Sequence, residues 1–195
     1  FAQDAAAGAD IDLDSLTGTT STPFSGNFLG EAWGNNTSDA DVRLMIQGYN
    51  LVEWDAEEGG FRFDPTVVSG VIATRSNKNG SKTYDINLAD DLYYSDGTKI
   101  TAKDYVFAML FTMSPEAAKA GAAKDAGSFI NGAEEFKAGK AINVTGIRLY
   151  DDYHFSVTVD PDYEPFFYEL GYFNYYPVSP DMLMPGLFVK DDGHG

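Results

Sequence analysis

The stretch LYYSDGTKITAKDYVFAMLF, residues 92–111, decides the fold. It starts as an apolar strand end, turns at Ser95-Asp96-Gly97, where glycine accepts a positive φ, and continues as an amphipathic helix. Thr101 can cap this helix, and Asp104, three residues later, completes a capping-box pair. Because turn and cap explain the carboxylates of Asp96 and Asp104, we interpret both as structural rather than catalytic.

Two β-hairpins are predicted on either side of this helix. The first joins VVSGVIAT (67–74) to TYDINL (83–88), and Asn79-Gly80 between them is a strong turn signal. The second joins VTGIRLY (144–150) to YHFSVTV (153–159). Apolar and polar residues alternate in these strands, which is typical of half-buried antiparallel strands. We therefore predict an α+β fold, with an antiparallel or mixed sheet built from two hairpins and helices packed on it.

Composition divides the chain into four segments. Residues 1–22 are small, acidic and rich in threonine, and we expect a flexible leader. Residues 23–60 are expected to give a strand in FSGNFLGEAWG and then a helix of a larger subdomain, and residues 61–180 a small α+β subdomain. Residues 181–195 read as a tail.

The helix predicted in residues 23–60 is capped by Ser38 or Asp39. Its apolar face consists of Val42, Met45, Ile46 and Tyr49. A second, short helix is expected over PDYEPFFYELG (161–171), with Pro165 near its first turn and Gly171 at its end.

Charge and composition exclude several classes of protein. The net charge of −17 would repel the phosphates of nucleic acids and the surface of anionic membranes. The sequence has no cysteine, so it offers neither a disulfide scaffold nor a thiolate metal site nor a cysteine nucleophile. Such a composition fits an exported protein.

Motifs for catalysis or cofactor binding are missing from the sequence. His154 and His194 stand in no metal-ligand pattern, and the chain has no nucleophile elbow, Walker loop or GxGxxG. Asp10, Asp12 and Asp14 begin like a calcium loop but lack its glycine and glutamate. We expect no enzymatic activity, no cofactor and no metal site. A hydrolase with paired carboxylates is not demanded by any pattern.

Two long blocks carry a family resemblance. TYDINLADDLYYSDGTKITAKDYVFAML (83–110) forms the first block, and the second combines FINGAEEFKAGKA (129–141), VTGIRLYDDYHFSVTV (144–159) and EPFFYELGYFNYYPVSP (164–180). In their motifs, order and spacing they resemble the extracellular solute-binding proteins of family 5, the oligopeptide and dipeptide receptors of ABC importers. The "lDP"-like segment usual near the start of that family is not seen, and FSGNFLGEAWGNN stands in its place.

The resemblance implies a fold and a function. The chain would be the N-terminal part of the first lobe of a two-lobed, periplasmic-binding-protein-like (type II) fold. The whole receptor would capture extracellular oligopeptides by hinge closure and present them to an ABC permease in the membrane. Its place would be extracytoplasmic, at the cell surface or in the periplasm, with a lipid anchor as one option in the full-length protein.

By the same resemblance, the N-terminal extended segment borders the ligand cleft. It supplies Asn27, Phe28, Glu31 and Trp33 as candidate ligand-binding residues, with Phe129 in the matching loop of the small subdomain. Simple packing of a glycine-spaced aromatic segment into the core is the competing interpretation.

The C-terminal aromatic cluster has two interpretations as well. We expect it to be core rather than a stacking platform; it comprises Phe166, Phe167, Tyr168, Tyr172, Phe173, Tyr175 and Tyr176. An exposed platform would favour the alternative function, a stand-alone extracellular carbohydrate- or protein-interaction module. An apolar surface where the rest of the lobe would dock is also predicted, with self-association through it as one consequence.

Overall fold

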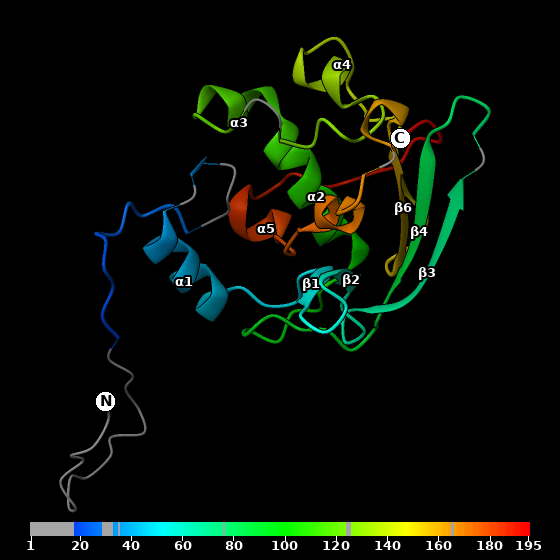
Figure 1. Ribbon diagram of the computed structural model, residues 1–195. Helices are drawn as coiled ribbons and strands as arrows, with labels where there is room; N and C mark the ends of the chain where they lie inside the picture. Colours follow the sequence, from blue (N-terminus) through cyan, green and yellow to red (C-terminus); the bar gives the residue numbers. More distant parts are fainter. Residues whose placement is uncertain (1–17, 29–32, 35, 76, 124–125, 165) are drawn as a thin grey trace, which may run out of the picture.

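A four-stranded antiparallel sheet and the helix that covers it form the centre of the molecule (Figure 1). The strand order is β3-β4-β6-β5. The strands are β3 (Val68–Arg75), β4 (Lys82–Leu88), β5 (Ile147–Leu149) and β6 (His154–Val159), and the helix is α2 (Ala102–Met113). This arrangement confirms the predicted α+β class and both hairpins. The computed structural model describes residues 18–28, 33–34, 36–75, 77–123, 126–164 and 166–195.

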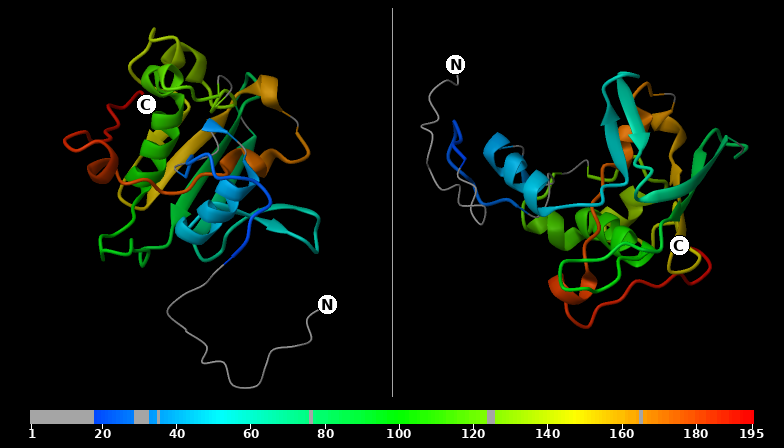
Figure 2. Two further views of the ribbon diagram at one scale, coloured as in Figure 1. Left: turned by 90° about the vertical axis from the view of Figure 1, so that its left-hand side faces the viewer. Right: turned by 90° about the horizontal axis from the view of Figure 1, so that it is seen from below.

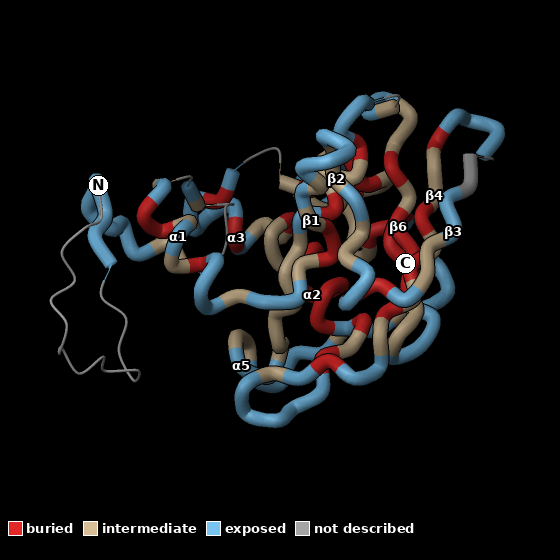
Figure 3. The backbone as a smooth tube through the Cα atoms, turned by 60° about the horizontal axis from the view of Figure 1, so that its bottom comes forward, coloured by how far each residue is buried: buried red, intermediate tan, exposed pale blue. Residues whose placement is uncertain are grey.

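The two hairpins join through their inner strands. β4 pairs with β3 across the Asn79-Gly80 turn, where Gly80 has a φ of 87°. On its other side β4 pairs with β6, with Ile86 opposite Phe155. The side chains of Ile86 and Phe155 are fully buried, and Figure 3 shows buried backbone concentrated around this sheet and α2.

Helix α2 is anchored at its N-terminus as the sequence predicts. The Asp104 carboxylate accepts hydrogen bonds from the backbone N–H of Thr101 (2.7 Å) and from its hydroxyl (2.9 Å). Tyr105 and Met109 are fully buried, and the Tyr105 ring stacks on Phe155 of β6 with centroids 6.4 Å apart. Residues 92–94 differ from the prediction: they form an isolated bridge between Tyr93 and Lys99 rather than a strand end.

Helix α1 (Thr37–Ile46) lies on the side of α2 away from the sheet (Figures 1 and 2). Its N-cap is Asn36, whose side chain accepts from the N–H groups of Ser38 and Asp39, so the cap predicted at Ser38 or Asp39 is wrong. The described residues of segment 18–36 contain no strand. Tyr49, placed on the helix face by its spacing, lies beyond the helix at a positive φ of 62°.

A small second sheet follows α1 and was not predicted. β1 (Val52–Asp55) pairs with β2 (Gly60–Phe63), so the boundary predicted between residues 60 and 61 falls inside this hairpin. The short 3-10 helix η3 (Glu169–Phe173) packs against it. The predicted helix over 161–171 is wrong: η2 (Pro161–Tyr163) and η3 occupy its ends, and Pro165 lies outside the described residues.

Three short helices and an ordered C-terminus complete the fold. The helices are α3 (Pro115–Lys119), α4 (Ala133–Lys137) and α5 (Pro180–Leu183). The tail is bonded to β5: Asp191 accepts hydrogen bonds from the Arg148 side chain (2.8 Å) and from the backbone N–H of Leu149 (2.9 Å). Over the described ranges, no helix has the length and apolar character needed to cross a bilayer.

Candidate functional site

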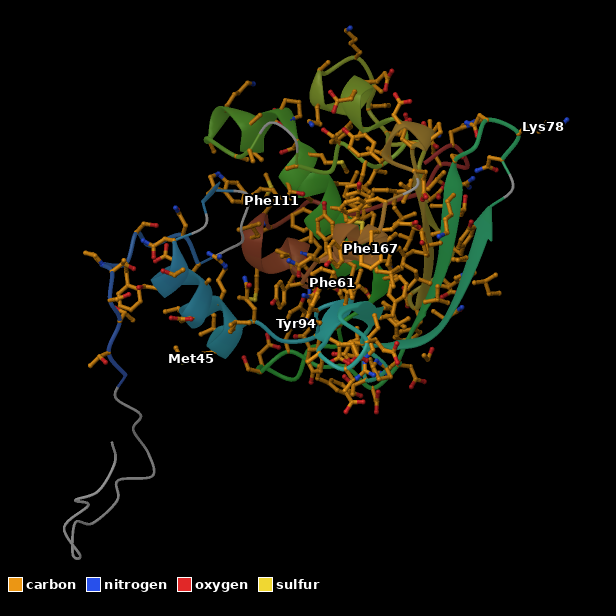
Figure 4. All side chains as sticks on the ribbon, viewed as in Figure 1. Met45, Phe61, Lys78, Tyr94, Phe111 and Phe167 are labelled. Atoms are coloured by element: carbon orange, nitrogen blue, oxygen red, sulfur yellow. The ribbon has the colours of Figure 1, made fainter. Side chains whose placement is uncertain are left out.

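A cavity of about 500 Å³ opens between α1, α2 and the aromatic C-terminal segment. The N-terminal part contributes Trp33, Arg43 and Gln47, α2 contributes Ala108, Phe111 and Thr112, and the C-terminal segment contributes Tyr172, Tyr175 and Tyr176 among others. In Figure 4, Phe111 is labelled on α2, between the sheet and α1. Ala123, Ala126, Gly127 and Phe129 complete the wall, so the cavity is built by segments that are far apart in the sequence.

The polar face of α1 holds the N-terminal segment against the cavity. Arg43 is 4% exposed, and its Nη1 donates to the carbonyl oxygen of Asn27 (2.8 Å). One turn later, Gln47 Nε2 donates to the carbonyl oxygen of Phe28 (3.0 Å). Both side chains also line the cavity, so this face of α1 fixes the segment and shapes the wall.

One turn before Arg43, Asp39 fastens the same segment. Its carboxylate accepts hydrogen bonds from the backbone N–H groups of Ser25 (2.9 Å), Gly26 (3.4 Å) and Asn27 (2.9 Å), and from the Ser25 hydroxyl (2.5 Å). Burial favours the neutral acid, but these bonds to the charged form outweigh it and hold the pKa of Asp39 below its ordinary value. The segment thus wraps around an ionised carboxylate.

Aromatic rings form most of the remaining wall. The Trp33 ring lies 5.7 Å from that of Phe111, and Phe129 stacks on Tyr172 with centroids 4.8 Å apart. Burial raises the pKa of Tyr175 to about 12, against a hydrogen bond with Thr112 that lowers it. Tyr175 therefore presents a neutral hydroxyl at neutral pH.

The predicted site residues meet different outcomes. Trp33 and Phe129 both line the cavity, although Phe129 is largely buried in the core. Asn27 and Phe28 stand behind the wall and contribute carbonyl oxygens to Arg43 and Gln47. Glu31 lies outside the described residues.

Sequence reasoning missed Arg43, Gln47 and Phe111. The signal for the first two was present: Asp39, Arg43 and Gln47 recur every four residues and so share one helix face. The prediction assigned burial to the apolar face instead.

The C-terminal aromatic cluster splits in two. Phe173 is fully buried, as predicted, but Phe166 and Tyr168 are substantially exposed and Phe167 is 86% exposed. A second cavity of about 540 Å³ is lined by Trp54, Phe61, Phe166 and Tyr168, with Gly171 and Tyr172 shared with the first.

The rings around the second cavity do not form a flat platform. Trp54 meets Phe61 at 83° and Phe61 meets Tyr168 at 89°, whereas Phe166 stacks on Tyr172 at 27°. The platform alternative needs several coplanar rings, and of these three pairs one is stacked.

The described lining of the first cavity is largely apolar and aromatic, with a few polar groups. No Asp or Glu is among the described residues that line the first cavity. Across the described ranges, no three His, Cys, Asp or Glu side chains gather as metal ligands. A hydrophobic cavity with few, fixed polar groups is typical of a small-molecule or peptide subsite.

Comparison with known proteins finds a matching family and several similar proteins. Residues 67–193 match the family described as "Bacterial extracellular solute-binding proteins, family 5 Middle". The dipeptide-binding protein of Lactococcus lactis subsp. cremoris (strain MG1363) is 28% identical over 153 residues, which cover 76% of this chain and 27% of that protein. The periplasmic oligopeptide-binding protein OppA of Escherichia coli (strain K12) is 32% identical over 102 residues, which cover 52% of this chain and 18% of that protein.

Solved structures agree on the fold. The substrate-binding domain of an oligopeptide ABC transporter from Bacillus anthracis str. Ames superposes with a TM-score of 0.59 at 25% identity, over 77% of this chain and 27% of that one. The chain spans between a fifth and about a quarter of the length of these relatives.

Proposed function

Because the chain belongs to family 5 of the bacterial extracellular solute-binding proteins, we propose that it is part of the substrate-binding component of an ABC-type peptide importer. The match over residues 67–193 carries this proposal, because that range includes α2 and both hairpins. The relatives named above bind dipeptides or oligopeptides, which supports peptide as the cargo class.

The proposed mechanism is capture without chemistry. A peptide binds between two lobes, its backbone held by main-chain hydrogen bonds that tolerate varied side chains. Hinge closure then buries it and presents it to a membrane permease. Residues 23–180 would supply one part of that first lobe, with 61–180 as its small subdomain, and the cavity beside Trp33 and Arg43 would border the cleft. No catalytic step is part of this function.

The same proposal includes the cellular location of the receptor and the contacts of its exposed apolar side chains on α1. The receptor works outside the cytoplasm, at the cell surface or in the periplasm, with a lipid anchor as an optional feature of the full-length protein. The apolar side chains Leu44, Met45 and Ile46 of α1 are between 64% and 71% exposed. Remaining parts of the first lobe would cover them, and without that cover they favour self-association.

Calorimetric titration tests the proposal. A pool of short peptides is titrated into the 195-residue chain and, in parallel, into a protein extended through the second lobe. We expect the extended protein to bind and the shorter chain to bind far more weakly, because most of the cleft is missing from it. If the extended protein releases no heat with any peptide, the cargo assignment is wrong.

A further inference from the structure

The first cavity differs from the rest of the protein in its charge. The chain carries 30 Asp and Glu against 13 Lys and Arg. Yet among the described residues that line this cavity, Arg43 is the one charged side chain and no carboxylate is present. In so acidic a protein, such a wall favours a ligand of negative charge.

Arg43 is buried without a counter-ion from the described part of the chain. A guanidinium has five N–H donors, and the hydrogen bond that Arg43 makes there goes from Nη1 to the Asn27 carbonyl. No described carboxylate lies within 4.0 Å of it. The nearest acidic residue on its own helix face, Asp39, is occupied by the N–H groups of residues 25–27.

An uncompensated buried cation is unfavourable, because it has lost water without gaining an opposite charge. A carboxylate brought by a ligand would restore that balance, and the planar fork of arginine matches a carboxylate with two parallel hydrogen bonds. Arg43 is 4% exposed and lines the cavity, so a ligand bound in the cavity lies next to it.

The remainder of the wall specifies what else the ligand carries. Trp33, Phe111, Tyr172 and Tyr176 all line the cavity. A volume of about 500 Å³ accommodates one or two amino-acid-sized groups. Apolar or aromatic groups would bury their surface against these rings.

We propose that this cavity binds a carboxylate carried on an apolar or aromatic body, with Arg43 as its anchoring cation. The identity of the ligand rests on the proposed peptide-receptor function. Under that function, the carboxylate and its apolar body are the C-terminal residue of a peptide.

A pair of probes that differ only in charge tests the proposal. N-acetyl-L-phenylalanine and N-acetyl-L-phenylalaninamide are titrated calorimetrically into the 195-residue chain. We expect the acid to bind at least about tenfold more tightly than the amide, as a charge-assisted hydrogen bond predicts. Equal affinities, or no binding of the acid, would overturn the proposal without any variant being needed.

Two variants assign the effect to Arg43. Arg43→Gln should reduce the affinity of the acid to that of the amide and leave the amide unchanged. Arg62→Gln is the matched control, because Arg62 is exposed and paired with Glu53 and Asp55 away from the cavity. If Arg43→Gln does not fold, Arg43→Lys retains the charge and should keep a preference for the acid. Acid binding that survives unchanged in a folded Arg43→Gln protein contradicts the proposal.

Fluorescence locates the bound probe. The chain has two tryptophans, of which Trp33 lines this cavity and Trp54 the other. In a Trp54→Phe protein the acid should change the emission of Trp33, and an emission that stays constant at saturation places the probe elsewhere and refutes the site. A third probe, 3-phenylpropanoate, distinguishes a free aryl acid from a peptide C-terminus. If it binds more tightly than N-acetyl-L-phenylalanine, the site is assigned to free acids. Peptide binding by the extended protein is scored separately, so either proposal can fail alone.

Discussion

At the scale of single residues, Glu169 shows how a buried charge joins two parts of the chain. Its carboxylate lies 2.6 Å from Lys82 Nζ and accepts the hydroxyl of Tyr84, and Lys82 also lies over the Tyr84 ring. The three residues connect η3 to the end of β4. Each of the three side chains provides a charge or hydrogen-bond partner for the others. Removing one of them should therefore lower the stability of the fold more than removing one member of a surface ion pair.

Replacement of Glu169 by alanine should therefore destabilise the protein. We expect Glu169→Ala to lower the free energy of unfolding by about 3 kcal/mol, because it leaves the Lys82 ammonium partly buried and unpaired. Urea unfolding at pH 7 measures the change. Glu116→Ala, which removes an exposed partner of Lys119, should cost less than about 0.5 kcal/mol. Equal effects of the two changes would contradict the buried role of Glu169.

Asp191 gives a second prediction, on pH. Burial alone would raise the pKa of Asp191, but hydrogen bonds from the Arg148 side chain and the N–H groups of Leu149 and Gly193 lower it to about 2. A lowered pKa stabilises the fold above the ordinary aspartate value near 4, and this contribution is lost as the pH falls from about 4 to about 2.

Asp191→Asn should consequently lower the free energy of unfolding at pH 7 by about 1–2 kcal/mol and change it little at pH 2. Urea unfolding at several pH values from 2 to 7 gives both numbers. Asp91→Asn, in an exposed loop position, is the control and should leave the pH profile unchanged. A deficit of the same size at pH 2 would show that the carboxylate charge is not involved.

At the scale of elements, the correct predictions were those whose sequence signals lie within a few residues of each other. The two hairpins and α2 were predicted because alternation, an Asn-Gly turn and a capping pair all lie within a few residues of each other. The β1–β2 hairpin was missed although Gly59-Gly60 is a turn signal and Gly59 has a φ of 67°, because its short strands, in which Trp54 pairs with Phe61, leave no room for a long run of alternation. The burial of Phe173 was predicted, but Phe166, Phe167 and Tyr168 were wrongly assigned to the core, because the cover of each ring depends on residues remote in sequence, such as Trp54 and Phe61 beside Tyr168.

One element junction is tight enough to test. Gly146 precedes β5, and a Cβ built there would lie 2.6 Å from the carbonyl oxygen of Asn131 and 2.8 Å from its nitrogen. The same backbone bonds Gly146 N–H to Asn131 O (2.8 Å) and Thr158 N–H to Gly146 O (2.7 Å).

Alanine at this position should force the 131 and 146 segments apart. We expect Gly146→Ala to cost about 1–3 kcal/mol, as overpacking does elsewhere, and thermal unfolding measures it. Gly60→Ala is the control, because a Cβ there meets nothing within 4 Å. A melting temperature of Gly146→Ala equal to that of the control would show that the junction can relax.

At the scale of the whole molecule, α1 buries its polar side and presents the apolar side chains of Leu44, Met45 and Ile46 outward. Met45 projects from α1 away from the sheet (Figure 4). The periodicity of α1 was readable in the sequence, but which face is buried was not, because the buried contacts of Asp39 and Arg43 are made with a segment of irregular structure. The first cavity was unpredictable for the same reason: its walls come from residues between Trp33 and Gln47, between Ala108 and Thr112, between Ala123 and Phe129, and between Tyr163 and Val178.

Exposure of this face predicts concentration-dependent association. Replacing Leu44, Met45 and Ile46 together by serine should shift the sedimentation of the 195-residue chain toward the monomer and leave its thermal stability nearly unchanged. Serine at both Ile142 and Phe188 is the control, because these side chains are also apolar and exposed but lie outside α1. Association that persists in the α1 variant would place the contact on another surface.

The pairing of β4 with β6 affects the order in which the sheet forms. Each outer hairpin closes over a short loop, but Lys82 meets Val159 and Asn87 meets His154 only after the whole intervening chain is in place. Closing so long a loop is entropically costly and slow compared with forming the hairpins. During synthesis, the two hairpins therefore cannot join until β6 has been made. A ribosome paused before residue 159 would carry a chain in which one edge of β4 is still unpaired.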